Sequence, residues 1–277
     1  MDSADLPRSG AGPVWDPEQY RRHAGPRLRP LYDLLARVPD LPSPRPRVAD
    51  LGCGPGGPTA LLAERWPAAR ITGYDLSEAM LAEARAYAGP TASGGSVDFV
   101  RADLAAWRPG LPHDLIVSNA ALHWVPGHAA RFPAWLGALR PGGVLAFQVP
   151  GNFTAPSHTL LDGLRASPRW RDRLGPGAGR APVLEPAEYA EALAGPGCEA
   201  DVWETTYVHV LTGEDPVLEW TKGTALRPVL TALDGDPAAR DAFLAEYRDL
   251  LREAYPPGPH GTLFPFRRIF AVVRGNA

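Results

Sequence analysis

Residues 48–57 read Val48-Ala49-Asp50-Leu51-Gly52-Cys53-Gly54-Pro55-Gly56-Gly57. The apolar run from Arg47 to Leu51 predicts a buried strand, and the glycines predict a tight turn directly after it. Residues 59–66 then carry the periodic apolar pattern of a helix. A strand, a glycine turn and a helix in this order open a nucleotide-binding α/β unit, because glycine lets the backbone pass close beneath a ligand.

The spacing and charge of this turn discriminate between nucleotides. The glycines follow a Gly-x-Gly-x-Gly pattern, and Pro55 and Pro58 lack the amide donors that a pyrophosphate would use. Asp50 lies at the end of the strand, where a carboxylate repels phosphate groups and attracts a cation. The amino and sulfonium groups of S-adenosylmethionine are such cations, so the turn favours this cofactor over NAD. The alternative is a tight turn that binds no ligand.

Composition limits the class of protein. The 277 residues, 45% of them hydrophobic, are enough for one large α/β domain with a subdomain. A net charge of −3 offers no basic surface, so no nucleic acid partner is expected. The two cysteines, Cys53 and Cys198, make no disulfide framework. No apolar run reaches membrane-spanning length and no signal peptide is apparent, so we expect a cytoplasmic protein without a membrane partner. The sequence gives no indication of an oligomeric state.

An acidic residue ends the second predicted strand, residues 71–75. Asp75 lies 23 positions after Gly52, about where an acid contacts ribose hydroxyls in nucleotide-binding α/β folds. Asp75 could instead cap the helix predicted over residues 78–88, but Ser77 is better placed for that role. We therefore expect Asp75 to contact the ribose.

The next two predicted strands, residues 97–103 and 114–120, also have polar residues at or next to their carboxyl ends. Asp103 is positioned to accept the adenine amino group, with Leu104 against the ring, and Asn119 ends the following strand. Ligands of open α/β sheets bind outside the carboxyl ends of the strands, so these side chains are expected to converge.

The loop beyond Asn119 holds His123 and Trp124. At this position His123 either lines the ligand pocket or is a packed or helix-capping histidine, which is the commoner use of a single histidine. The sequence shows no Ser/His/Asp set and no metal-ligand spacing, so no metal site is expected.

Strand and helix patterns alternate up to residue 150, with a helix expected over 129–139 and a strand over 144–149. This alternation predicts a parallel sheet with helices on both faces. Residues 1–14 are expected to be disordered, and 15–150 to form the cofactor-binding core with an N-terminal helix. That helix is expected to begin near Asp16 and to break at Pro26 and Pro30.

Two insertions interrupt the alternation after residue 150. Residues 151–184 and 212–260 have helical or irregular patterns, whereas 185–211 and 261–277 return to the core. The alternating segment 198–211 is expected to be an edge or antiparallel strand. We expect the two insertions to pack together as a lid over the ligand edge of the sheet.

Several segments together resemble the trans-aconitate 2-methyltransferase family of class I S-adenosylmethionine-dependent methyltransferases. The class as a whole is indicated by the glycine turn, Asp75, Asp103 and the turn Arg140-Pro141-Gly142-Gly143. The family is indicated by Trp15-Asp16-Pro17, Leu34-Leu35-Ala36-Arg37-Val38-Pro39, Arg65-Trp66-Pro67-Ala68-Ala69-Arg70, Thr205-Thr206-Tyr207 and Leu226-Arg227-Pro228. The resemblance covers nearly the whole chain after residue 14. It departs at Gly57-Pro58, where the family has a more polar pair, and at His123, where it has glutamine.

The resemblance implies both a fold and an activity. The fold would be α/β, a Rossmann-like doubly wound sheet with an inserted, mostly helical lid. The activity would be methyl transfer from S-adenosylmethionine to a carboxylate of trans-aconitate, a small polycarboxylate, giving a monomethyl ester and S-adenosyl-L-homocysteine. Because a carboxylate is already ionised at pH 7, in-line displacement needs neither a general base nor a metal.

The candidate site residues fall into three groups. The cofactor-binding candidates are Asp50, Gly52, Gly54, Gly56, Asp75, Leu76, Asp103, Leu104, Asn119 and Tyr20. The candidates for holding the substrate carboxylates are Tyr207, His209, Arg227 and Arg268, and those for lining the pocket are His123 and Trp124. An arginine is more often a solvated surface group, and only the resemblance favours Arg227.

Two other functions stay open from the sequence. One is a small-molecule methyltransferase of specialised metabolism that acts on another acid, a phenol or a carbon. A phenol or carbon acceptor would need a base near the methyl group, and His123 would be the candidate. The other is a catalytically silent S-adenosylmethionine-binding protein, against which the intact cofactor acids argue.

Overall fold

A mixed sheet forms the centre of the molecule. The computed structural model describes residues 24–175, 183–195 and 198–275, and within them a nine-stranded sheet has the order β3-β4-β2-β1-β5-β6-β9-β7, with β8 paired to β9. The strands are β1 Arg47–Leu51, β2 Arg70–Asp75, β3 Gly89–Pro90, β4 Ser96–Arg101, β5 His113–Asn119, β6 Leu139–Pro150, β7 Glu199–Leu211, β8 Pro257–Gly258 and β9 Gly261–Arg274. Strands β4, β2, β1, β5 and β6 are mutually parallel, whereas β9 pairs antiparallel with β6 and the edge strand β7 pairs antiparallel with β9. The predicted parallel core and antiparallel edge strand are both confirmed.

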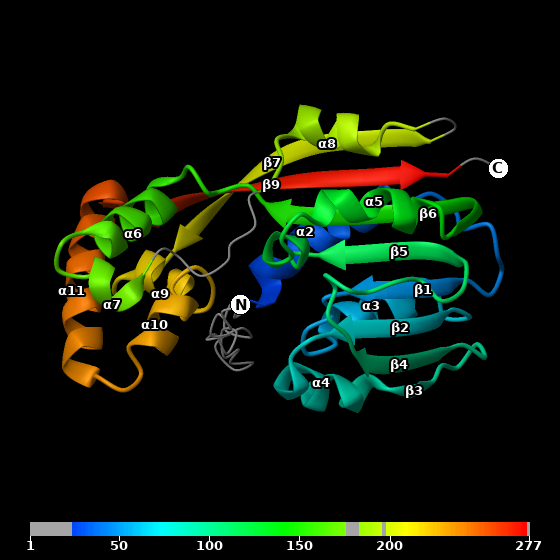
Figure 1. Cartoon of the computed structure of the whole chain (residues 1–277), viewed down its shortest axis with the longest axis horizontal. Coiled ribbons are helices and arrows are strands. Elements are labelled where there is room, and N and C mark those ends of the chain that lie inside the picture. Colours follow the sequence, from blue (N-terminus) through cyan, green and yellow to red (C-terminus); the bar gives the residue numbers. More distant parts are fainter. Residues whose placement is uncertain (1–23, 176–182, 196–197, 276–277) are drawn as a thin grey trace, which may run out of the picture.

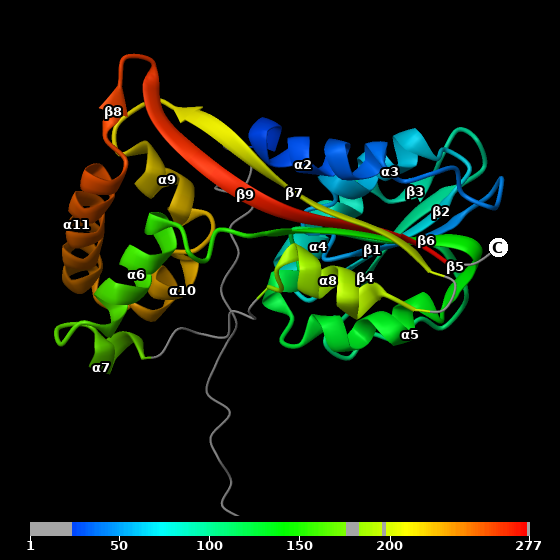
Figure 2. The same cartoon turned by 90° about the horizontal axis from the view of Figure 1, so that it is seen from above.

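Helices cover both faces of this sheet (Figure 2). On one face lie α2 Ala24–Ala36 and α3 Gly57–Arg65, and on the other α5 Phe132–Leu136 and α8 Pro186–Leu193. Strand residues alternate between the two apolar clusters, with Val48 facing α2 and α3 and Ala49 facing α5 and α8. Between β2 and β4 the chain forms α4 Glu78–Ala84 and a 3₁₀ turn Arg85–Tyr87. The expected disorder of residues 1–14, and Tyr20, lie outside the described residues.

The helix α2 does not break at Pro30, so the break predicted there is wrong, whereas Pro26 lies in the first turn of α2 and the chain before residue 24 is outside the described residues. The helix runs continuously from Ala24 to Ala36 with Pro30 inside it. Its buried leucines Leu31 and Leu34 pack against the sheet, and this burial outweighs the backbone hydrogen bond that proline removes.

The helix predicted over residues 129–139 is also shorter than expected. It consists of a 3₁₀ turn, His128–Arg131, followed by α5, and β6 already begins at Leu139. The predicted turn at 140–143 is therefore absorbed into the start of β6, where Gly142 adopts a φ of +73°. A glycine with positive φ lets the strand bend there without ending.

A second lobe is built from helices of both insertions. These are α6 Pro156–Ala166, α7 Arg171–Leu174, α9 Pro216–Lys222, α10 Arg227–Ala232 and α11 Pro237–Ala254. They share one apolar cluster, which includes Trp170, Trp220 and Phe243, with the outer ends of β7 and β9. The sequence patterns did not predict α10.

Strands β7 and β9 form a long ribbon that joins the helical lobe to the sheet (Figures 1 and 2). The arrowhead of β5 points toward the helical lobe, which therefore lies beyond the carboxyl ends of the parallel strands. Helices α9 and α10 lie on the side of the lobe that faces the sheet, and α11 lies on the far side. Among the residues described, none of the helices has the length and apolar character needed to cross a membrane.

Candidate active site

The glycine turn after β1 can be made only from residues without side chains at two of its positions. Gly52 and Gly56 have φ of +79° and +86°, a region that other residues rarely adopt. A Cβ atom on Gly52 would lie 2.1 Å from the Cβ of Ala121, and one on Gly56 would lie 2.9 Å from the Cα of Ala84. Gly54, with φ of +54°, has open space around its Cα instead. The turn thus leaves room for a ligand at Gly54.

Asp75, at the end of β2, is tied to this turn. Its Oδ2 accepts the Gly54 amide at 3.0 Å and its Oδ1 accepts the Ser77 amide at 2.9 Å. Burial raises the pKa of the carboxyl group, although the amide hydrogen bonds favour its charged form. The Ser77 hydroxyl accepts the Met80 amide at 3.3 Å, which confirms Ser77 as the cap of α4. Each carboxylate oxygen can accept a further hydrogen bond, so Asp75 retains capacity to bind a ligand.

Asp50 adds a second acid beneath the turn. It is 2% exposed, and the hydroxyl of Thr59 donates to its Oδ2 at 2.6 Å. Burial raises the pKa of Asp50 to about 6; the Thr59 hydrogen bond lowers it and the nearby Asp75 charge raises it. Two acids this close to the glycine turn favour a cationic ligand there.

The residues after β4 are arranged less as expected. The strand ends at Arg101 rather than at 103, so exposed Asp103 lies in the following turn, where its Oδ1 accepts the Ala105 amide at 2.9 Å. Buried Leu104 lies near the glycine turn, because a Cβ on Gly52 would be 3.7 Å from its Cδ1. Leu76, which follows Asp75, is exposed.

The chain turns sharply where β5 ends. Ala120 has a φ of 54°, and its amide donates to the Gln148 carbonyl at 3.0 Å. A left-handed conformation costs a non-glycine residue about 1–2 kcal/mol, and such strain often occurs at functional sites. The turn leads into the 3₁₀ segment Leu122–Trp124, where the rings of buried His123 and half-buried Trp124 lie 4.9 Å apart.

A row of polar side chains crosses β5, β6 and β9 near the carboxyl ends of the parallel strands. The Nε2 of Gln148 donates to the Oδ1 of Asn119 at 2.6 Å, and the Nη1 of Arg268 donates to the Oε1 of Gln148 at 3.4 Å. Gln148 is 0% exposed and Arg268 is 7% exposed. Burying polar side chains costs free energy unless they are hydrogen-bonded. The presence of three such side chains in a row within the sheet therefore needs an explanation. It brings together one predicted cofactor residue and one predicted substrate residue.

Gln148 is not among the site residues predicted from the sequence. A signal was present, because Gln148 is the one polar residue in the otherwise apolar segment 144–149. A single polar residue is unexpected in a strand that is buried on both faces, and it indicates a candidate functional residue.

Tyr207 and His209 lie on the same face of the β7–β9 ribbon as Arg268. Tyr207 pairs with Phe266, next to the pair formed by Thr205 and Arg268, and His209 follows one step further toward the helical lobe. The Arg268 guanidinium lies 4.6 Å from the centre of the Phe266 ring. The His209 ring lies 4.7 Å from that of Trp220 in α9. Arg268, Tyr207 and His209 therefore follow one another from the sheet to the helical lobe.

Helix α2 contributes two residues here that sequence reasoning missed. The Tyr207 hydroxyl donates to the Oδ2 of Asp33 at 2.6 Å, and the Arg29 guanidinium lies 5.0 Å from the centre of the Tyr207 ring. Burial and the Asp33 carboxylate raise the pKa of Tyr207, so its hydroxyl stays protonated. Arg29 and Asp33 are one helical turn apart, but nothing in the sequence connects them to a tyrosine in a distant strand.

Arg227 lies in the other lobe. It is the first residue of α10, half-buried, and α10 belongs to the side of the helical lobe that faces the sheet (Figure 1).

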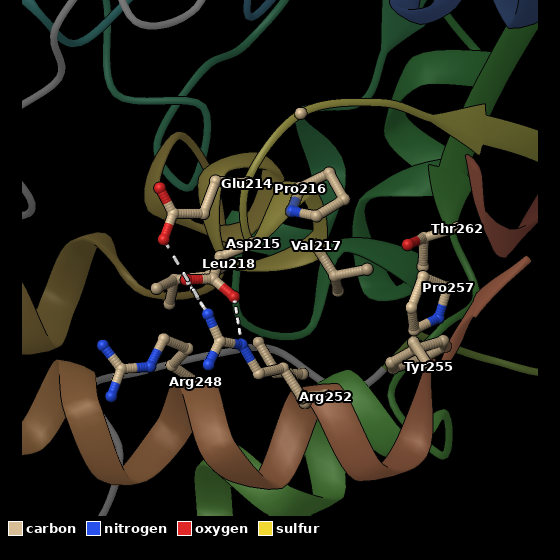
Figure 3. Close-up of a pocket in the computed structure, with 12 residues that line it drawn as sticks. Glu214, Asp215, Pro216, Val217, Leu218, Arg248, Arg252, Tyr255, Pro257 and Thr262 are labelled. Carbon is tan, nitrogen blue, oxygen red and sulfur yellow. Dashed lines mark hydrogen bonds and ion pairs between the residues drawn. The ribbon is translucent and has the colours of Figure 1, made fainter.

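A pocket of about 310 Å³ opens elsewhere, between α9, α11 and the start of β9 (Figure 3). Arg252 donates to Asp215 at 2.6 Å and lies 3.9 Å from Glu214, so the charges in this pocket largely balance. None of the predicted site residues that the structure describes lines it. We assign this pocket no part in the reaction.

Comparison with known proteins identifies the family. Residues 48–143 match the family described as a methyltransferase domain. A trans-aconitate 2-methyltransferase from Streptomyces coelicolor is 64% identical over 264 residues, which cover 95% of this chain and 87% of that protein. One from Streptomyces avermitilis is 62% identical over 268 residues, covering 96% and 99%. The chain belongs to the trans-aconitate 2-methyltransferase family.

Membership of the trans-aconitate 2-methyltransferase family confirms the resemblance seen in the sequence. The protein is an S-adenosylmethionine-dependent methyltransferase with a Rossmann-like class I fold. Among solved structures, the YcgJ protein of Bacillus subtilis matches with a TM-score of 0.56 and 14% identity, covering 91% of this chain and 99% of that chain, which supports the fold alone. The open space at Gly54 and the acids Asp50 and Asp75 fit this cofactor.

Proposed function

We propose that this protein transfers the methyl group of S-adenosylmethionine to a carboxylate of trans-aconitate and forms a monomethyl ester. The observation that carries this proposal is the buried guanidinium of Arg268, which Gln148 links to Asn119 at the end of β5. A buried cation close to the cofactor edge of the sheet suits an anionic substrate. The names of the relatives that are 62% and 64% identical support the choice of acid.

The cofactor is assigned to the carboxyl ends of β1, β2, β4 and β5. Asp50 attracts the positively charged end of the cofactor, and Gly52, Gly54 and Gly56 allow close approach of the backbone. Asp75 accepts the ribose hydroxyls. The further contacts proposed for the adenine and the adjoining groups are Leu76, Asp103, Leu104, Asn119 and Tyr20.

We assign the acid to the edge of the sheet that faces the helical lobe. Arg268, Tyr207 and His209 hold it from the ribbon, and Arg227 approaches from α10. His123 and Trp124 line the pocket near the methyl group. In this arrangement segments 151–184 and 212–260 act as a lid, because their helices share one core and lie beyond the strand ends.

The proposed reaction needs positioning more than proton transfer. When bound, S-adenosylmethionine supplies an electrophilic methyl group. A carboxylate oxygen bonds to that carbon, the carbon–sulfur bond breaks, and its electron pair stays on sulfur, so no proton is moved. Arg268, His209 and Arg227 hold the other carboxylates and leave one oxygen for attack. Orientation of this kind can supply about 7–11 kcal/mol of a barrier.

The proposed function can be tested with labelled S-adenosylmethionine and a panel of acceptors. The panel contains trans-aconitate, other di- and tricarboxylic acids, a monocarboxylic acid and a phenol. We expect label in a base-labile methyl ester of trans-aconitate. Preferred labelling of the phenol would favour an enzyme that uses His123 as a base, and no labelling with any acceptor would favour a silent binding protein.

The raised pKa of Asp50 predicts pH-dependent cofactor binding. The ionised carboxylate attracts the cofactor, so affinity should be full above pH 6 and fall as the pH drops through about 6. For one proton the fall approaches about tenfold per pH unit. Calorimetry at several pH values, in buffers of different ionisation enthalpy, would measure both the affinity and the proton released on binding. In Asp50→Asn this dependence should disappear; equal wild-type affinity at pH 5 and pH 8 would remove Asp50 from the site.

A further inference from the structure

Asn152, just beyond β6, is a buried polar residue that the proposed function leaves without a role. It is 4% exposed, and its Oδ1 accepts the Arg267 amide at 2.6 Å. The Gly151 amide donates to the Arg267 carbonyl at 2.9 Å, so the asparagine side chain extends the β6–β9 ladder by one hydrogen bond. Within the described part of the chain, the buried Nδ2 of Asn152 has no hydrogen-bond partner.

An unsatisfied buried donor of this kind calls for an explanation. Most buried side-chain donors in proteins are paired, and exceptions often await a ligand or water. The ladder role of Asn152 requires only an acceptor oxygen, which an aspartate would supply equally well. The amide nitrogen is therefore the part of this side chain that the fold does not use.

The position of Asn152 connects this donor with the substrate arginine. Its hydrogen bond to Arg267 places the side chain beside the backbone that enters Arg268. Across the ladder, Arg268 pairs with Pro150, two residues before Asn152. Both side chains are thus buried at the carboxyl end of β6, where the row of Asn119, Gln148 and Arg268 ends.

We propose that the Nδ2 of Asn152 donates a hydrogen bond to the substrate carboxylate that Arg268 binds, an inference that rests on the proposed function. The neutral amide of Asn152 would donate a hydrogen bond to the carboxylate from a different direction than the guanidinium of Arg268, without adding charge. Two donors in different directions fix the orientation of the carboxylate. An acid that lacks this carboxylate would leave the buried Nδ2 of Asn152 unpaired, and a site with a buried unpaired donor rejects such analogues strongly. Asn152 is therefore a specificity-determining residue for polycarboxylic acids.

The variant Asn152→Asp separates this role from a structural one. It keeps an acceptor oxygen for the Arg267 amide but replaces the donor with a carboxylate oxygen. We would measure the Kd of trans-aconitate for the complex of the protein with S-adenosylhomocysteine. This Kd should rise at least about tenfold in the variant, which is the effect expected when a hydrogen bond to a charged group is lost. The Kd of S-adenosylhomocysteine should stay unchanged and the Tm should not fall.

Two further variants serve as controls. Val208→Glu adds the same charge beside Tyr207 but on the outer face of β7, where Val208 is 58% exposed, and it should bind the acid like wild type. Asn152→Ala removes both groups, so it should lose acid affinity and also some thermal stability.

Wild-type affinity for the acid in Asn152→Asp would overturn the inference and leave Asn152 a purely structural residue. An equal loss in Val208→Glu would overturn it as well, because net charge would then explain the effect. Failure of the wild-type complex to bind trans-aconitate would instead contradict the proposed function itself.

Discussion

Replacing Arg268 with alanine is expected to lower kcat/KM for trans-aconitate by about 30-fold to 1000-fold. Loss of a charged hydrogen-bond partner in a desolvated pocket costs about 2–4 kcal/mol, which corresponds to this range. Cofactor affinity should barely change, because β9 is separated from β1 by β5 and β6. Steady-state kinetics with the acid, together with the cofactor Kd from calorimetry, measure both effects.

Two comparisons make the Arg268 result specific. Arg268→Lys keeps the charge but not the planar pair of donors, so it should fall between wild type and alanine. Arg171→Ala, which removes an exposed arginine of α7, should leave the kinetics unchanged. Survival of acid turnover in Arg268→Ala, or collapse of cofactor affinity with it, would make the assignment wrong. Arg227→Lys and Arg227→Ala, in the facing lobe, would then be the next variants to measure.

Asp75→Ala is expected to weaken S-adenosylmethionine binding by at least about tenfold, and by up to about 100-fold. The variant loses the acceptors proposed for the ribose. It also loses the two bonds by which the carboxylate holds the Gly54 and Ser77 amides. The first loss removes a ligand contact and the second loosens the glycine turn at Gly54, so the cofactor Kd should respond more strongly than the stability of the fold.

Calorimetry on Asp75→Ala needs a control for simple destabilisation of α4. Ser77→Ala removes the hydroxyl that caps this helix, which costs about 1 kcal/mol, but keeps the backbone amide that Asp75 binds. It should lower the Tm while leaving cofactor affinity near the wild-type value. Unchanged affinity in Asp75→Ala would remove Asp75 from the cofactor site.

The cofactor half of the fold could be predicted because its signals are local. The apolar run before Gly52, the turn itself and Ser77 before α4 lie within short segments whose chemistry allows few alternatives. Helix α2 shows the limit of local signals. The break expected at Pro30 does not occur, because burial of Leu31 and Leu34 against the sheet outweighs the propensity of one residue.

The residues proposed to bind the substrate were harder to predict, because their positions depend on the register between strands that are distant in the sequence. Arg268 and Gln148 are separated by 120 positions, and they meet only because β6 pairs with β9. The contact of Asp33 with Tyr207 spans 174 positions, and the sequence gives no sign of it. Asn152 was missed for another reason. An asparagine just after a strand resembles an ordinary loop residue, and only its burial distinguishes it.

Base-free transfer to a carboxylate is tested most directly by the pH dependence of a single turnover. We would follow formation of the methyl ester of trans-aconitate between about pH 6 and pH 9, at saturating cofactor, in wild type and in His123→Ala. We predict a nearly flat rate in both proteins, because the attacking carboxylate is ionised throughout and His123 only lines the pocket. A wild-type rate that rises through a histidine-like pKa of about 6.5, with a flat low rate in His123→Ala, would contradict carboxylate methylation without a base.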